Sequence, residues 1–229
     1  RNAGGDRHFA GFGGRKTTDF ADTALNADLL PENLWKNADY LVMGTLGLAY
    51  PLSRRAMQRA LELAKIYGVK VLIDINWRPV FWPNLEAAPD RIRDFIFRAD
   101  LLKCSEEEAA WLFGTDTPGE ISSQYPNLGT ILVTGGAKGC KYHLGENSGN
   151  VEAFPGKVVD TTGAGDGFVA GFLARAGLGG DQIGENADLA RKAVIYACAV
   201  GAMVTRRAGA IASQPTREQV EEFLAAFES

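Results

Sequence analysis

The sequence feature that most constrains the fold is the alternation of short apolar runs with longer amphipathic stretches. The short runs are rich in Val, Ile and Leu and are typical of buried strands, whereas the amphipathic stretches repeat apolar residues at helical spacing. The two patterns alternate through residues 40–136. Strands that alternate with helices predict a mostly parallel sheet covered by helices on both faces. We therefore expect an α/β fold, a three-layer α/β/α sandwich, with residues 1–229 forming a single domain.

The expected elements can be placed along the chain from these patterns. Gly68 supplies a C-terminal stop for the first long helix. The segment 141–154 predicts a hairpin that turns at residues 147–150. The last helix begins with a capping box formed by Thr216 and Gln219. In full, we expect strands at 40–44, 69–76, 100–104 and 129–136, helices at 51–68, 89–99 and 105–114, and further helices after the hairpin.

Composition excludes several classes of protein. The formal net charge of -4 leaves no broad basic surface for nucleic acid. The longest apolar run, residues 193–204, is shorter than the ~20 residues that a membrane-spanning helix needs. The three cysteines are scattered along the chain, which argues against a disulfide framework or a zinc site and favours a reducing compartment. We therefore expect neither a nucleic-acid partner nor a membrane partner.

One short stretch, residues 158–168 (VVDTTGAGDGF), gathers three glycines and two aspartates directly after an apolar run. Glycine allows a sharp backbone turn or the close approach of another group. The residues that follow have helical spacing, so the stretch predicts a strand, a glycine turn and a helix start. Unhindered backbone N–H groups at a helix start can bind an anion. A dinucleotide fingerprint would need its third glycine at Phe168, so a nicotinamide or flavin enzyme is not expected.

Polar clusters also follow three earlier strands, at the edge of the sheet where α/β proteins bind ligands. DINWRPVFW at 74–82 offers several polar side chains, but it equally fits a capped turn with a packed tryptophan. Ser105 and Glu108 fit a capping box; in a functional interpretation, Glu108 holds Mg²⁺ through water. The glycines of VTGGAKG at 133–139 would let a nucleotide approach the backbone, although a lone glycine loop is a weak signal.

The stretch VVDTTGAGDGF resembles the C-terminal signature of the ribokinase-like, or PfkB, family of sugar and nucleoside kinases. KCSEEEAAWLFG (103–114) resembles the segment that carries the family's magnesium-associated glutamate, and DINWRPVFW resembles the Asn-x-Arg-x-x-x-Trp segment of fructokinases. Residues 199–216 follow the fructokinase C-terminal pattern without gaps. The resemblance covers essentially the whole chain. It implies a ribokinase-like fold and the activity of an ATP-dependent carbohydrate kinase closest to the fructokinases.

The resemblance also implies roles for individual residues. Asp166 would accept the proton of a sugar hydroxyl, while the N–H groups of Gly163, Ala164 and Gly165 would hold the phosphoryl group in transfer. The alternative for Asp166 is an exposed aspartate at a helix start, a contribution of under ~1 kcal/mol. The other implied residues are Asn76 and Arg78 for substrate and phosphate, Lys103, Ser105, Thr134, Gly136, Gly139 and Cys198 for nucleotide, Glu108 for Mg²⁺, and Asp160 and Thr162 for a monovalent cation or for plain turn hydrogen bonding.

These roles together predict ATP-dependent phosphorylation of a sugar hydroxyl, with fructose as the expected acceptor. The expected cofactors are ATP and Mg²⁺, with K⁺ as a further activating cation. The expected partners are a small sugar and ATP, and homodimerisation of the complete protein is left open. Two alternatives also stay open: a kinase of the same family for a keto-deoxy sugar acid or a nucleoside, and a fructokinase-like interaction protein without turnover.

The start of the chain at Arg1, without a methionine, leads us to expect a longer protein. By the resemblance, the family's first strands, a sugar-binding glycine pair and a small β lid would precede this chain. The resemblance and the scattered cysteines together predict a location in the cytoplasm or the plastid stroma.

Overall fold

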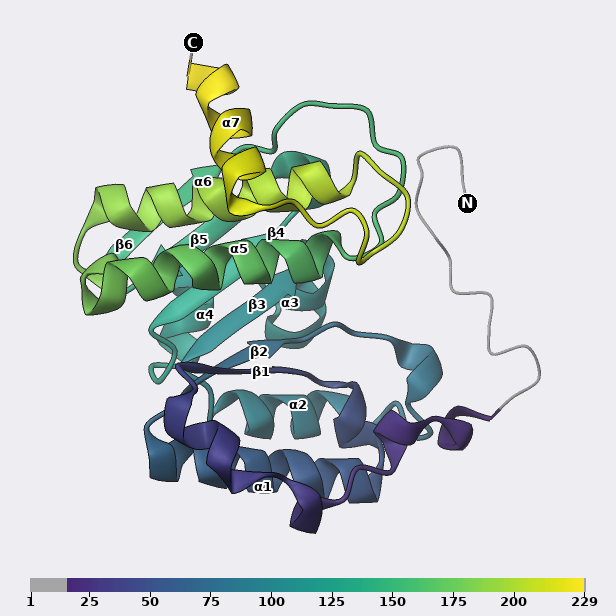
Figure 1. Ribbon diagram of the computed structural model, residues 1–229. Helices are drawn as coiled ribbons and strands as arrows, with labels where there is room; N and C mark the ends of the chain where they lie inside the picture. Colours follow the sequence, from purple (N-terminus) through teal and green to yellow (C-terminus); the bar gives the residue numbers. More distant parts are fainter. Residues whose placement is uncertain (1–15, 229) are drawn as a thin grey trace. The chain divides into compact units, whose positions relative to one another are not determined.

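A computed structural model describes residues 16–228, which fall into two compact units (Figure 1). We call residues 16–133 the N-terminal unit and residues 134–228 the C-terminal unit. The six strands form one mixed sheet in the order β1-β2-β3-β4-β5-β6, with flanking helices. This arrangement confirms the predicted α/β/α sandwich. The assignment of the whole chain to a single domain stays a prediction.

In the N-terminal unit, strands and helices alternate as the apolar pattern predicts. The elements are β1 (Tyr40–Gly44), α1 (Pro51–Tyr67), β2 (Lys70–Asp74), α2 (Ala88–Ile96), β3 (Leu101–Ser105), α3 (Glu106–Phe113), α4 (Pro118–Gln124) and β4 (Thr130–Thr134). Gly68 ends α1 in the left-handed conformation, with φ of 70°, as expected from its position. The short helix α4 was not expected, because its few apolar residues give no helical repeat.

The core of the N-terminal unit lies around the central strands. Leu72 and Ile73 in β2 are both fully buried although they point to opposite faces of the sheet, so both faces are covered. Figure 1 shows α1 and α2 packed along the same side of β1 and β2. Strands β1, β2 and β3 are parallel, and their register places Asp74 beside Gly44 on one side and Lys103 on the other.

The C-terminal unit consists of a hairpin and three helices. Its elements are β5 (Cys140–Leu144), β6 (Asn147–Val151), α5 (Ala164–Gly179), α6 (Ala187–Val204) and α7 (Arg217–Glu228). Figure 1 shows α5 and α6 side by side. A side chain at Gly171 would come within 2.8 Å of Val200, so glycine allows this close helix packing. Among the described helices, none combines the length and the apolar character needed to cross a bilayer.

The hairpin confirms one expectation and corrects another. Strands β5 and β6 pair in antiparallel fashion, as predicted for residues 141–154. The turn, however, lies at Gly145 and Glu146, because Leu144 pairs with Asn147. Gly145 has φ of 57°, a conformation that glycine adopts more readily than asparagine. The prediction of a turn at residues 147–150 was therefore wrong: those residues form β6.

Candidate functional site

The first group of site residues lies in the turn that leads into α5. The carboxylate of Asp160 is fully buried, and its Oδ1 accepts hydrogen bonds from the backbone N–H of Thr162 at 3.1 Å and from the Thr162 hydroxyl at 2.7 Å. Its Oδ2 accepts the N–H of Gly209 at 3.2 Å. The buried carboxylate therefore fixes the turn and ties it to a loop 49 residues further along the chain.

That loop, residues 205–216, packs against the turn. The carbonyl of Thr205 accepts the N–H groups of Val159 and Asp160. The Gln214 side chain donates to the carbonyl of Gly163 at 3.4 Å. Gly163 has φ of 80°, and a Cβ there would lie 2.9 Å from Ala210. Position 163 therefore requires glycine both for its backbone conformation and for its close contact with the loop.

The start of α5 presents backbone donors and an acidic side chain. Within the described residues, the N–H groups of Gly163 and Gly165 have no acceptor in the chain, whereas the N–H of Ala164 donates to the carbonyl of Thr161 at 3.2 Å. Asp166 lies in the first turn of α5 and is exposed. The unpaired N–H groups at this helix start can bind an anionic ligand. The carboxylate beside them is accessible to a second molecule that reacts with that ligand. The roles of these residues stay predictions.

A second glycine turn joins β4 to β5 in the C-terminal unit. The N–H of Gly135 donates to the carbonyl of Gly139 at 2.8 Å, which closes the loop after Thr134. A Cβ at Gly139 would lie 1.9 Å from the carbonyl oxygen of Val151, so this glycine is required by the neighbouring strand. Gly136 has open space on its Cβ side, which leaves room for a ligand. Of the expected nucleotide residues in this loop, Gly136 has the most accessible backbone.

Cys198 lies in α6 and is buried. Burial raises the pKa of its thiol to about 12, so the side chain is a neutral, apolar-like group at ordinary pH. It can therefore contribute packing to a neighbouring ligand and no charge. Its assignment to the nucleotide site stays a prediction.

In the N-terminal unit, a buried ion pair occupies the carboxyl ends of β2 and β3. The Lys103 ammonium lies 3.1 Å from each carboxylate oxygen of Asp74, and both side chains are almost entirely buried. The parallel register, in which the two residues are direct neighbours, brings them together. Lys103 is expected at the nucleotide from the resemblance, and the structure shows its ammonium bound to Asp74.

Glu108 joins the ends of the same two strands. Its Oε1 accepts the N–H of Trp77 at 2.6 Å, and its Oε2 accepts the N–H of Ser105 at 2.8 Å. The Ser105 hydroxyl accepts the N–H of Glu108 in return, so the predicted capping box is confirmed. The carboxylate thus fixes the loop after β2 to the start of α3.

The expected substrate residues Asn76 and Arg78 lie on either side of Trp77, whose N–H binds Glu108. Asn76 has φ of 44°, a left-handed conformation that asparagine tolerates better than most residues. Arg78 is exposed, and its guanidinium donates to the carbonyl of Trp77 at 2.8 Å. The Trp77 ring stacks on that of Trp111 at a centroid distance of 4.3 Å. The loop after β2 is therefore held by hydrogen bonds and ring packing, with the Arg78 side chain at its surface.

The residues present can accommodate the two expected cations. The carboxylate of Glu108 has about four lone-pair sites and uses two of them on backbone N–H groups, so it can still accept a water bound to Mg²⁺. Asp160 is a fully buried carboxylate that accepts three hydrogen bonds, so a monovalent cation would bind at its remaining lone pairs. Within the described residues, no group of three or more His, Cys, Asp or Glu side chains forms a metal site by itself.

The structure thus brings two groups of the expected residues together, one in each unit. Asp160, Thr162, the glycine turn and Asp166 share one turn of the C-terminal unit, and Lys103, Ser105 and Glu108 share one strand edge of the N-terminal unit. Gly209 and Gln214 were not predicted from the sequence, because their contacts lie 49 and 51 residues away along the chain. No local pattern signals such contacts.

A family model described as pfkB family carbohydrate kinase matches residues 4–217. The chain belongs to the pfkB carbohydrate kinase family. The resemblance inferred from the glycine turn is thereby confirmed. Residues 4–15 of the match lie outside the part that the structure describes.

Individual relatives of this pfkB family chain include fructokinases. Probable fructokinase-5 of Arabidopsis thaliana is 34% identical over 207 residues, which are 89% of this chain and 64% of that protein. A crystal structure of the fructokinase of Vibrio cholerae O395, in its fructose-, ADP- and calcium-bound form, has a TM-score of 0.79 and 30% identity over 89% of this chain and 66% of that chain.

A kinase for another acceptor is also similar. The aminoimidazole riboside kinase of Salmonella enterica, complexed with aminoimidazole riboside and an ATP analog, has a TM-score of 0.72 and 26% identity over 89% of this chain and 67% of that chain. This chain therefore spans about two thirds of the length of these relatives.

Proposed function

We propose that the protein transfers the terminal phosphoryl group of ATP to a hydroxyl of a sugar, with fructose as the acceptor. The observation that carries the proposal is the turn before α5, where unpaired N–H groups adjoin an exposed carboxylate at a helix start. Membership of a carbohydrate kinase family and similarity to fructokinases support it.

The backbone of the turn supports the binding of the transferring group. In phosphoryl transfer, charge spreads over the oxygens of a loose transition state, so donors that are already oriented stabilise it without reorganisation. The N–H groups of Gly163 and Gly165 meet this requirement because residues 16–228 give them no acceptor. The N–H of Ala164 can contribute only as a shared donor, since it already bonds Thr161.

Asp166 supports the handling of the proton. The sugar oxygen forms a bond to phosphorus, the bond from phosphorus to the ADP oxygen breaks, and the hydroxyl proton passes to the Asp166 carboxylate. A carboxylate is a weak base for an alcohol, so the proton moves late and the orientation of the hydroxyl is the larger contribution. Exposure of Asp166 to solvent is compatible with the entry of a sugar.

Cations complete the proposed reaction. Mg²⁺ would neutralise charge on the phosphates, with Glu108 accepting one of its water ligands. Asp160 and Thr162 would hold a monovalent cation, and K⁺ should then activate the enzyme. Asn76, Arg78, Lys103, Ser105 and the loop from Thr134 to Gly139 are proposed to contact substrate or nucleotide.

The identity of the molecule that accepts the phosphoryl group is the most specific part of the proposal. The segment Asn76 to Trp82 resembles fructokinases, and the relatives named fructokinase favour fructose. The similarity to aminoimidazole riboside kinase keeps a nucleoside as the second candidate. A keto-deoxy sugar acid is the third, and a fructokinase-like protein without turnover is the alternative from another class. We propose a location in the cytoplasm or the plastid stroma, in accord with three buried free cysteines.

The test is an ADP-release assay on the full-length gene product with fructose, adenosine and 2-keto-3-deoxygluconate as acceptors. We expect the highest kcat/KM with fructose. Asp166→Asn should lower kcat by about 10²- to 10⁴-fold and leave ATP affinity nearly unchanged, because the amide fits but cannot accept the proton.

Asp188→Asn is the matched control, because Asp188 is likewise an aspartate in the first turn of a helix, α6. It should keep the wild-type rate. A rate above about a tenth of wild type in Asp166→Asn would refute the assignment of the base. The absence of turnover with every acceptor in the wild-type protein would favour the interaction protein.

A further inference from the structure

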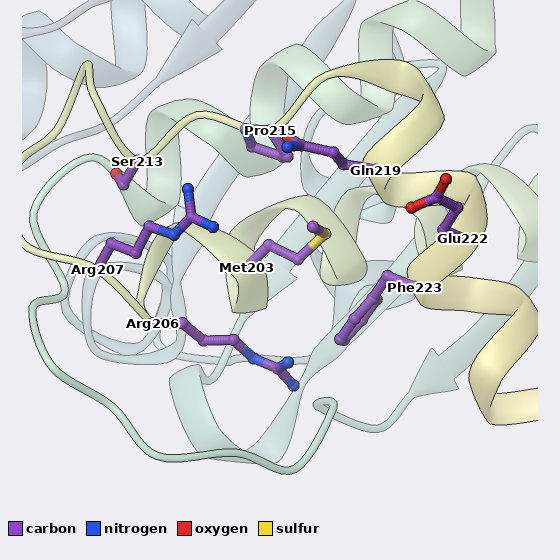
Figure 2. A pocket seen from close by; sticks show the side chains of 8 residues that line it. All are labelled: Met203, Arg206, Arg207, Ser213, Pro215, Gln219, Glu222 and Phe223. Atoms are coloured by element: carbon purple, nitrogen blue, oxygen red, sulfur yellow. The ribbon is translucent and has the colours of Figure 1, made fainter.

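A pocket of about 360 Å³ lies in the C-terminal unit, apart from all residues assigned above to substrate, nucleotide or cations (Figure 2). Its walls come from the end of α6, the loop 205–216 and the first half of α7. The lining side chains are Met203, Arg206, Arg207, Ser213, Pro215, Gln219, Glu222 and Phe223. Its size falls at the lower end of the range for small-molecule sites in proteins.

Two arginines line this pocket, and their guanidinium groups point in different directions (Figure 2). Arg206 is held in place: it lies 4.5 Å from the centroid of the Phe223 ring and donates to the carbonyl of Pro155 at 3.1 Å. Arg207 forms no hydrogen bond or ion pair with the part of the chain that the structure describes, so all its donors are available. The unengaged guanidinium of Arg207 suits an anion with several oxygen acceptors, because its planar fork of donors can bind two of them at once.

The opposite side of the pocket has different chemistry. Figure 2 shows Glu222 and Gln219 across Met203 from Arg207. A carboxylate at this place repels a second negative charge and accepts hydrogen bonds from hydroxyl groups, as does the Gln219 amide. Met203 and Phe223 supply an apolar floor. The pocket therefore suits a ligand with one anionic end and a compact hydroxylated body.

The pocket wall is bonded directly to the turn before α5. Ser213, which lines the pocket, donates to the carbonyl of Gly209, and the N–H of Gly209 donates to the buried Asp160. Gln214, the next residue, donates to the carbonyl of Gly163. A ligand that holds the loop 205–216 in one conformation therefore also acts on the carboxylate and the glycine that shape the turn.

We propose that this pocket is a second binding site, which takes a phosphomonoester with a hydroxylated body, such as a sugar monophosphate, and whose occupancy is coupled to the turn at 160–166. This site goes beyond the proposed phosphoryl transfer, and its binding can be measured without turnover. The phosphate contacts Arg207, and the hydroxyl groups face Gln219 and Glu222.

The binding test uses calorimetric titration of the full-length gene product with glucose 6-phosphate. Arg207→Met should weaken binding roughly tenfold or more, because a charge-assisted contact to the phosphate is lost. Glu222→Gln should tighten binding, because a repelling carboxylate is removed. Arg191→Met is the matched control: it removes the same charge from an exposed position of α6, 12 residues before Met203, and should leave affinity unchanged.

Two further probes define the class of ligand. Gluconate, with a carboxylate on a similar body, should bind more weakly than glucose 6-phosphate, and neutral glucose should show no binding that depends on Arg207. Equal affinity of the wild-type and Arg207→Met proteins for glucose 6-phosphate would overturn the site. Gluconate binding as tight as that of the phosphate would overturn the phosphomonoester class.

Coupling is tested by the affinity for ADP with and without saturating glucose 6-phosphate. We expect a change of about fivefold or more in the wild-type protein, the lower end of typical coupling between sites, and none in Arg207→Met. An unchanged ADP affinity despite Arg207-dependent binding would refute the coupling. Because ADP and glucose 6-phosphate binding are measured without fructose, failure here is distinct from failure of the proposed sugar phosphorylation.

Discussion

The strand ends of the N-terminal unit and the turn before α5 in the C-terminal unit differ in the exposure of their acidic residues. In the N-terminal unit, Asp74 and Glu108 are buried, and their carboxylates bind Lys103 and backbone N–H groups. In the C-terminal unit, the buried Asp160 does this structural work and Asp166 is left exposed. In the C-terminal unit one carboxylate therefore shapes the turn, while the other, the proposed base, stays accessible to solvent.

The largest expected effect tests the buried pair of the N-terminal unit. Lys103→Met should lower the free energy of unfolding by about 3 to 5 kcal/mol, because the Asp74 carboxylate stays buried without its ammonium partner. Urea denaturation measures the loss. The double variant Asp74→Leu/Lys103→Met should recover part of it. Equal stability of wild type and Lys103→Met would show that the pair contributes little to the stability of the fold.

The next effect tests the fit of the turn in the C-terminal unit. Gly163→Ala should cost about 2 to 4 kcal/mol, because φ of 80° is strained for alanine and its Cβ would lie 2.9 Å from Ala210. Gly177→Ala, within α5, is the control at a position with open space around it and should be neutral or stabilising. A Gly163→Ala protein as stable as Gly177→Ala would contradict the tight contact with the loop.

Glu108 offers a smaller effect and separates a structural role from a metal role. Both its oxygens accept backbone N–H groups, so Glu108→Gln places an amide donor against one of them and should cost about 1 to 2 kcal/mol. If Glu108 also holds a water of Mg²⁺, the Mg²⁺ concentration for half-maximal rate rises as well. Glu107→Gln, at the exposed neighbouring position, should change neither quantity. An unchanged Mg²⁺ requirement in Glu108→Gln would leave only the structural role.

Thiol labelling compares the two units without changing the protein. Burial raises the pKa of Cys104 in the N-terminal unit and raises that of Cys198 in the C-terminal unit to about 12. At pH 8 each native thiol should therefore react at least about a hundredfold more slowly than in urea, since the thiolate is the reactive form. Mass spectrometry of the labelled sites gives both rates. Rapid labelling of Cys198 in the native protein would mean that α6 opens locally.

The same raised pKa values fix the sign of the alkaline effect on stability. The unfolded thiols lose their protons near their ordinary pKa, while the folded ones keep theirs. The free energy of unfolding should therefore be unaffected by these groups below about pH 8 and should fall as the pH rises from there toward 12.

Local signals in the sequence were enough for most of the secondary structure and for the family. The Gly68 stop, the Ser105–Glu108 capping box and the alternation of strands with helices were all predicted and confirmed. Each depends on residues a few positions apart, whose backbone conformations and hydrogen bonds are settled within one element. The predicted position of the hairpin turn was wrong because two segments there contain turn-forming residues. The pairing of Leu144 with Asn147 places the turn at Gly145 and Glu146.

By itself, then, the sequence determined the α/β alternation, the glycine turn before α5 and the family, because these depend on residues that are close together along the chain. Only the tertiary structure decided that Lys103 binds Asp74, that Glu108 ties β2 to α3, and that the loop 205–216 both fixes Asp160 and forms a pocket of its own. These features depend on strand register and on the packing of segments far apart in the chain. Such contacts form when the whole unit folds, so no local pattern of residues specifies them.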